Sequence, residues 1–195
     1  EIGVRLVGSE MCIRDRIGVV HGLAWTAVGG VTLKIEVNVM PGKGGIQITG
    51  SLGDVMKESA QAAISYIRSQ SKKYKIKNDF FEKHDIHIHI PEGAVPKDGP
   101  SAGITMTTAV LSAITGHKVY GNLAMTGEVT IRGDVLQIGG LKEKLLAAKR
   151  LGITKVLVPK MNEKDVKEFE EEVIEGLEIV YVKTMTQVIK EAFVH

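Results

Sequence analysis

The chain has 195 residues, 44% of them hydrophobic, which is enough to bury the core of one domain. Its 25 basic and 23 acidic residues leave a net charge of +2 without a basic stripe, so the composition gives no sign of nucleic-acid binding. The single cysteine, Cys12, excludes an internal disulfide framework, and the chain has neither an apolar run of about 20 residues for a membrane span nor a G-x-x-x-x-G-K-[ST] phosphate loop.

Residues 1–16 have neither helical nor strand periodicity and join abruptly to a well-patterned stretch that begins at Ile17. Within them, the string VGSEMCIRDR resembles translated sequencing-adapter read-through. We therefore expect residues 1–16 to be a non-native or unassigned leader, and residues 17–195 to form one domain.

The first half of that domain reads as strands around one helix. Residues 17–50 contain three apolar, β-branched runs separated by glycine-rich breaks, which predicts short antiparallel strands. Residues 53–74 repeat their apolar positions at helical spacing, which predicts an amphipathic helix. Residues 85–90 alternate strictly, which predicts a half-buried strand with isoleucines on one face and with His87 and His89 on the other.

In the second half, a helix of small and apolar residues is expected from about Ser101 to Gly116, after a loop rich in glycine and proline. Strands and helices then alternate, and the acidic run 170–172 is interpreted as a solvated helix face. This order favours a mixed α+β or α/β domain over an all-parallel sheet, and we predict the α+β class, with mixed sheets and N-terminal β-hairpins packed with helices. The expected strands cover residues 123–131, 134–140, 155–159 and 177–184, and the expected helices cover 141–152, 162–176 and 184–193.

Ser101 is a candidate nucleophile because it stands where the loop meets a helix start. Backbone N–H groups are unpaired at such a point, and those of Ser101 and Ala102 would suit a developing oxyanion. The alternative is structural, since serine is a preferred N-cap and such loops are ordinary. A base elsewhere in the chain is needed to favour catalysis.

Lys144 is the candidate base. On a helical wheel it falls between Ala148 and Leu151, near Leu141, on the apolar side of its helix. Burial disfavours the charged amine and lowers its pKa from about 10.4 towards working pH, as a general base requires. The alternative is a lysine whose stem covers apolar surface while its amine reaches water.

Other polar residues carry weaker signals. The pair His87 and His89 could bind a metal, but no cysteine or tight carboxylate cluster completes a set of ligands, so we predict no metal and expect one histidine to support the loop by a hydrogen bond. Asp98 precedes Ser101 by three residues and is interpreted as a loop-forming or helix-start residue rather than a triad acid. Trp25, the only tryptophan, is expected in the core or on the sheet surface.

Several motifs together resemble one family. PKDGPSAG around Ser101 and GGLKEKLLAA around Lys144, which lie 43 residues apart, resemble the nucleophile and base motifs of the Lon family of ATP-dependent serine proteases. GLAWT, HIHIPEGA and AMTGEVTIRGDVLQIGG are also similar to that family, so the resemblance to its C-terminal proteolytic domain covers residues 17–193. The intact GPSAG form resembles the soluble bacterial and organellar branch.

The resemblance implies a Lon proteolytic-domain fold and a role for each matching residue. Ser101 would attack the scissile carbonyl, Lys144 would accept its proton, and Thr126 would hydrogen-bond that lysine. Asp98 and His87 are expected to support the site. The same resemblance implies a serine endopeptidase that hydrolyses peptide bonds.

The resemblance also implies partners and a location. We expect unfolded or damaged proteins as substrates, in protein quality control and the stress response, with a homohexamer as the complete assembly and no nucleic-acid or membrane partner. The expected location is the cytoplasm, or the mitochondrial matrix in a eukaryote. ATP and Mg²⁺ would serve an ATPase module expected before Ile17, so we expect no cofactor in this chain and cleavage of only small or unfolded peptides, independently of ATP.

Two other classes remain open from sequence. The first is a non-catalytic Lon-like scaffold domain of the kind found in recombination-repair proteins, although such domains usually lack the complete dyad. The second is a small-molecule kinase whose glycine-rich loop holds a phosphate at a helix start. That second class offers no explanation for Lys144 on an apolar helix face.

Overall fold

The computed structural model describes residues 14–26 and 29–195, so most of the expected leader, residues 1–13, lies outside the described residues. Residues 14–16, the described end of this expected leader, are attached to the domain. Arg16 and Val119 exchange two backbone hydrogen bonds, of 3.2 and 2.8 Å, and the carboxylate of Asp15 accepts one from the backbone of a neighbouring glycine.

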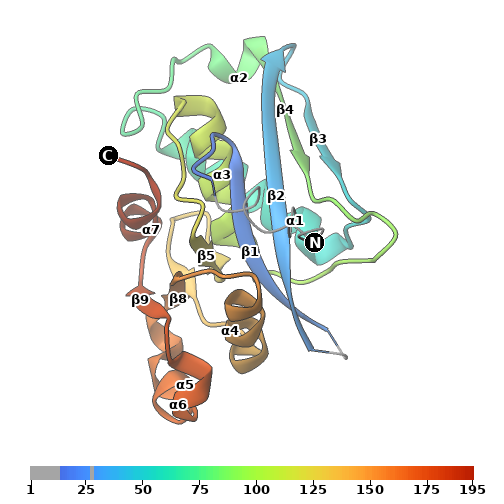
Figure 1. The fold of residues 1–195 in the computed structure, drawn as a ribbon. Helices are drawn as coiled ribbons and strands as arrows, with labels where there is room; N and C mark the ends of the chain where they lie inside the picture. Colours follow the sequence, from blue (N-terminus) through green and yellow to red (C-terminus); the bar gives the residue numbers. More distant parts are fainter. Residues whose placement is uncertain (1–13, 27–28) are drawn as a thin grey trace, which may run out of the picture.

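Seven strands form one mixed sheet in the spatial order β3-β4-β2-β1-β5-β8-β9 (Figure 1). The pairs β1–β2 and β2–β4 are antiparallel, whereas the other neighbours are parallel. The predicted class of mixed sheet packed with helices is confirmed. The strands are β1 (Val19–Thr26), β2 (Gly29–Pro41), β3 (Ile46–Thr49), β4 (His84–His89), β5 (Leu123–Met125), β8 (Lys155–Pro159) and β9 (Glu178–Val182).

The prediction of purely antiparallel strands in residues 17–50 is wrong for β3. This strand pairs in parallel with β4, which lies between it and β2. The reason is burial, because Ile86 and Ile88 of β4 are fully buried in the main core whereas every residue of β3 is at least partly exposed. The more apolar strand takes the inner place, and the more polar one forms the edge.

Helices cover both faces of the sheet. Val20 belongs to the core formed with α1 (Asp54–Ser69) and α3 (Gly103–Thr115), whereas Leu23 belongs to a second core formed with α4 (Leu141–Arg150). An odd separation along a strand places two side chains on opposite faces, so α4 packs on the face opposite α1 and α3. The last helix, α7 (Met185–Ala192), contacts α3.

Two expected elements are interrupted. The strand predicted over residues 123–131 breaks at Thr126 and Gly127, and the helix predicted over 162–176 breaks at Glu170, whose backbone is extended and whose carboxylate accepts a 2.7 Å hydrogen bond from Lys142 of α4. Helical periodicity in such a polar segment did not predict this break, because short helices in water depend on tertiary packing for their stability. The shorter elements are α2 (Phe80–Lys83), β6 (Glu128–Val129), β7 (Val135–Leu136), a 3₁₀ turn (Lys160–Asn162), α5 (Glu163–Lys167) and α6 (Glu171–Ile174).

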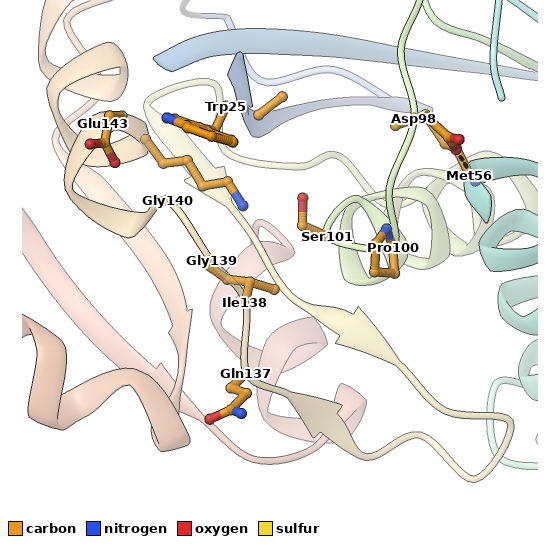
Figure 2. A pocket seen from close by; sticks show the side chains of 12 residues that line it. Trp25, Met56, Asp98, Pro100, Ser101, Gln137, Ile138, Gly139, Gly140 and Glu143 are labelled. Carbon is orange, nitrogen blue, oxygen red and sulfur yellow. Dashed lines mark hydrogen bonds between the residues drawn. The ribbon is translucent and has the colours of Figure 1, made fainter. Parts of the chain in front are cut away.

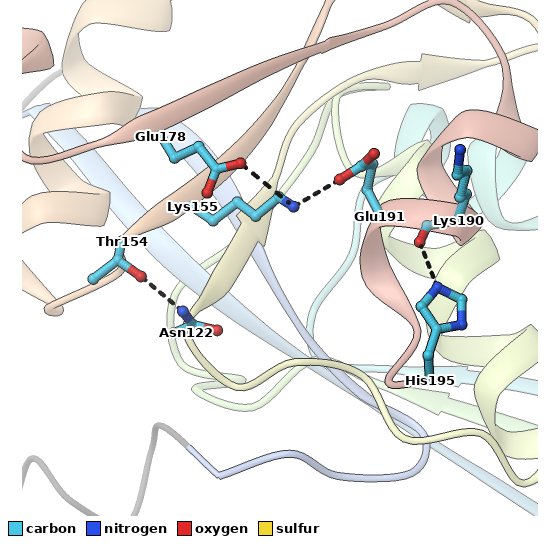
Figure 3. A network of polar contacts seen from close by, with 7 residues as sticks. All are labelled: Asn122, Thr154, Lys155, Glu178, Lys190, Glu191 and His195. Atoms are coloured by element: carbon cyan, nitrogen blue, oxygen red, sulfur yellow. Dashed lines mark hydrogen bonds and ion pairs between the residues drawn. The ribbon is translucent and has the colours of Figure 1, made fainter.

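A polar network joins the last helix to the sheet (Figure 3). The amine of Lys155 in β8 lies 2.6 Å from a carboxylate oxygen of Glu191 in α7 and 3.6 Å from one of Glu178 in β9. The lysine is partly buried, and its two carboxylate partners connect three elements. Within the described ranges, no helix combines the length and apolar character needed to cross a membrane.

The two carboxylates around Lys155 provide a matched test of this network. We expect Glu191→Gln to lower the free energy of unfolding by about 1 kcal/mol, because it removes the closer charge from a partly buried amine. We expect Glu178→Gln, at a side chain that is 65% exposed, to cost less than about 0.5 kcal/mol. Urea unfolding at pH 7 measures both, and equal losses would contradict this account.

Candidate active site

A pocket of about 590 Å³ lies where the end of β1, the loop before α3 and the start of α4 meet (Figure 2). Both residues that the sequence predicts to be catalytic, Ser101 and Lys144, line this pocket, which we call the Ser101 pocket. In Figure 2 the hydroxyl of Ser101 points into the space between Trp25 and the backbone of Gly139 and Gly140.

Lys97 shapes the loop that carries the nucleophile. Its buried amine donates hydrogen bonds to three backbone carbonyls, those of Glu92 at 2.7 Å, Val95 at 3.0 Å and Gly50 at 3.2 Å. An ammonium group has three N–H donors, so all of them have acceptors here. The loop therefore folds around a lysine whose hydrogen-bond donors are all satisfied by backbone carbonyls.

Asp98 connects this loop to α1. One carboxylate oxygen accepts hydrogen bonds from the backbone nitrogens of Met56, at 2.9 Å, and Gly99, at 2.8 Å. The helix begins after Gly53, which has no side chain to cap it, so Asp98 supplies the negative charge that a helix N-terminus favours. Asp98 is thus a loop and helix-start residue, but the helix is α1 and not the helix that follows Ser101.

The backbone of Ser101 is held against the segment after β5. Its carbonyl accepts hydrogen bonds from the nitrogen of Gly127, at 2.8 Å, and from the hydroxyl of Thr126, at 3.4 Å. Helix α3 begins at Gly103, two residues later than predicted, and its N-cap is Ala102. The N-cap interpretation of Ser101 is therefore wrong, and within the described chain its hydroxyl forms no hydrogen bond and is free to face the pocket.

The N–H groups of Ser101 and Ala102 lie just before the first turn of α3. Among the described residues, neither group donates a hydrogen bond to a protein acceptor. Unpaired N–H groups at a helix start carry partial positive charge, which is the property that an oxyanion site needs.

Lys144 is buried, with 3% of its surface exposed, as the helical pattern predicts. It shares the inner face of α4 with Leu141 and Ala148, which are also buried. Burial lowers the pKa of Lys144 from 10.5 to about 8. No acidic side chain among the described residues forms an ion pair with it, so nothing opposes this effect and a neutral amine is accessible near physiological pH.

Thr126 differs from its expected role. The resemblance implies a hydrogen bond to Lys144, but the hydroxyl of this fully buried threonine donates to the carbonyl of Ser101 instead. The reason is local, because Thr126 follows β5 directly alongside the Ser101 segment. In this structure it supports the nucleophile rather than the base.

The histidine pair also does not form the hydrogen bond to the loop before α3 that was expected from the sequence. The rings of His87 and His89 both contact the hydroxyl of Thr49 in β3, at 2.8 and 2.7 Å, and line a separate pocket on the sheet. In the part of the chain that the structure describes, no three His, Cys, Asp or Glu side chains are grouped to hold a metal ion.

Trp25 is the residue that sequence reasoning missed. It is 57% exposed, lines the Ser101 pocket and rests on Gly140, where an added Cβ would lie only 2.8 Å from the indole. Strand alternation places His21, Leu23 and Trp25 on one face of β1. The position of an aromatic residue at the end of this strand face could have indicated a role at the site. The sequence did not show, however, that α4 starts beside it.

Comparisons with known proteins agree with this geometry. Residues 2–195 match the family of the Lon protease (S16) C-terminal proteolytic domain. The Lon protease of Lachnoclostridium phytofermentans is 66% identical over 181 residues, which are 93% of this chain and 22% of that protein. The Lon protease of Clostridioides difficile is 62% identical and Lon protease 1 of Bacillus subtilis 58% identical, each over 180 residues that are 92% of this chain and 23% of the relative. The chain thus spans less than a quarter of these curated relatives.

The buried amine predicts an unusual dependence of stability on pH. Below pH 8, Lys144 is charged in the folded and unfolded states, and its burial costs folding about 3 kcal/mol. As the pH rises from 8 to 10.5, the folded state releases its proton first and this cost disappears. We therefore expect Lys144→Met to raise the free energy of unfolding by about 1 to 3 kcal/mol at pH 7, and this gain to shrink towards pH 10.5.

Urea unfolding at pH 7 and at pH 10 measures the difference between the two proteins. The control is Lys164→Met at an exposed position on α5, which we expect to change stability by less than about 0.5 kcal/mol at both pH values. A destabilising effect of Lys144→Met that is the same at both pH values would show that the lysine carries no burial cost.

Proposed function

We propose, because this chain belongs to the family of Lon protease C-terminal proteolytic domains, that it hydrolyses peptide bonds with Ser101 as nucleophile and Lys144 as general base. One observation carries the proposal. The amine whose pKa is lowered by burial lines the same pocket as a serine hydroxyl that forms no hydrogen bond with any described residue. Neither feature is needed for the stability of the fold, and the first opposes it.

In the first half of the proposed reaction, the neutral amine of Lys144 accepts the proton of the Ser101 hydroxyl. The oxygen then attacks the scissile carbonyl carbon, and the carbonyl oxygen becomes negatively charged. The N–H groups of Ser101 and Ala102 would stabilise this oxyanion. The ammonium of Lys144 next protonates the departing amine, which leaves an ester between the substrate and Ser101.

In the second half, a water molecule attacks the ester and Lys144 again accepts the proton. The tetrahedral intermediate collapses, the C–O bond to Ser101 breaks, and the proton returns from the lysine to the serine oxygen. The carboxylic product leaves and both residues recover their initial state. Thr126 and Asp98 would act by fixing the backbone of the nucleophile loop.

The proposal for the longer protein rests on the names of the relatives and on the resemblance. Unfolded or damaged proteins would be the substrates in the cytoplasm, in a homohexamer whose ATPase module uses ATP and Mg²⁺. This chain by itself would cleave small or unfolded peptides without ATP. The non-catalytic scaffold is not favoured, because both dyad residues are present and the named relatives are proteases. Membership of this family also leaves the kinase alternative without support.

The first test of the proposal is cleavage of an unstructured fluorogenic peptide by the purified chain. We expect Ser101→Ala and Lys144→Met each to lower kcat/KM by at least about 10³-fold, because each removes a group that reacts. Lys164→Met should retain the parent rate. Full activity of Lys144→Met would refute the assignment of the base, and an inert parent, with or without ATP, would favour the scaffold reading until an ATPase-fused hexamer is tested.

The pH dependence gives a second test. Only the neutral amine of Lys144 accepts a proton, so kcat/KM should rise with pH and level off above its pKa of about 8. Rates measured between pH 6 and 9.5 define this curve. A rise centred near pH 6.5, the ordinary pKa of histidine, would mean that a histidine is the base.

A further inference from the structure

Near the end of the β1–β2 hairpin, the described residues Trp25 and Gly30 pack closely against the start of α4. At Gly30, an added Cβ would lie 1.9 Å from the carbonyl oxygen of Glu143 and 3.0 Å from the backbone nitrogen of Lys144. On the paired strand, Trp25 rests on Gly140. Two glycines thus allow the hairpin to approach the turn of α4 that carries the base.

Arg150 links the far end of α4 to the same hairpin. Its guanidinium donates a 2.6 Å hydrogen bond to the carbonyl of Gly30, across 120 residues of sequence. A hydrogen bond from a charged donor is stronger than one between neutral groups, and its geometry fixes the position of the acceptor more closely. The arginine side chain is itself exposed, so its contribution is to the position of the hairpin rather than to the core.

We propose that Arg150 is a positioning residue that holds the β1–β2 hairpin, and with it Trp25, over Lys144 and so excludes water from the base. Arg150 does not touch the reacting atoms and acts only through the hairpin. The catalytic effect of this cover rests on the proposed function. The exclusion of water from the Lys144 amine does not.

Among the described residues, no charged group accounts for the lowered pKa of Lys144. The elements packed around it contribute titratable side chains, but burial alone lowers the pKa of the amine. Trp25 of the hairpin lines the same pocket as this amine, so cover by the hairpin is a property that a remote substitution would change. Two titratable side chains line the Ser101 pocket with Lys144, namely Glu143 of α4 and Asp98 of the nucleophile loop. On the sheet face that α4 covers lie His21 of β1 and, on β2, the ion-paired Lys34 and Glu36.

The direct test is titration of the Lys144 side chain by NMR in the chain labelled with ¹³C at lysine Cε. We expect Arg150→Met, which keeps the apolar stem but removes the donor, to raise the midpoint of Lys144 by about one pH unit, since water then reaches the amine. Arg150→Lys restores a charged donor and should give a smaller shift. Lys144→Met identifies the resonance.

The matched control is Lys149→Met. Lys149 is the neighbouring cation, and its amine donates to a backbone carbonyl of α6 rather than to the hairpin, so its loss should leave the Lys144 midpoint unchanged. A midpoint that is the same in Arg150→Met and in the parent would overturn the proposal, even if the melting temperature fell. Equal shifts for Arg150→Met and Lys149→Met would also overturn it, since they would indicate general loosening of α4.

Peptide cleavage extends the test to the reaction. Each unit of increase in the pKa of Lys144 lowers the neutral fraction of the amine at pH 7 about tenfold. We expect the pH–rate curve of Arg150→Met to move to higher pH by the shift that NMR measures, with its alkaline plateau retained. If NMR shows the shift while the parent cleaves nothing, the positioning role stands and the proposed function fails.

Discussion

The proposed active site depends on the burial of one amine that has no ion-pair partner among the described residues. Lys144 lies on the apolar face of α4 and has no carboxylate partner in the described part of the chain, and taking a charged ammonium out of water is costly. The structure tolerates this cost because the surrounding leucine, isoleucine and valine side chains form a continuous second core. The same burial gives the amine the acid–base behaviour that a catalyst needs at moderate pH.

Two buried lysines in this domain illustrate opposite uses of the same side chain. Lys97 donates to three backbone carbonyls and thereby folds the loop before α3, whereas Lys144 has no acceptor among the described residues. A charged amine whose donors all have acceptors stabilises a structure. A buried amine without such partners has a lowered pKa, so its neutral form can accept a proton. The first therefore shapes the loop that presents Ser101, and the second would react with it.

The proposed dyad is assembled across the sheet. Ser101 precedes α3, which packs with α1 on one face, whereas Lys144 belongs to α4 on the other face. The two meet at the Ser101 pocket, where β1 ends and the Thr126–Gly127 link follows β5. The site thus depends on the mixed sheet as a whole. This chain, which spans less than a quarter of the relatives' length, contains every residue proposed for the chemistry.

Local sequence by itself determined the features that depend on near neighbours. Helical spacing placed Lys144 on a buried face, strand alternation separated Ile86 and Ile88 from the histidines, and the glycine and proline around Ser101 marked its loop. Only the tertiary structure decided the parallel pairing of β3, the acceptor of Thr126 and the contact of Arg150 with the hairpin. These contacts join residues far apart in sequence, and their geometry depends on how whole elements pack, whereas periodicity reports only which face of one element is buried.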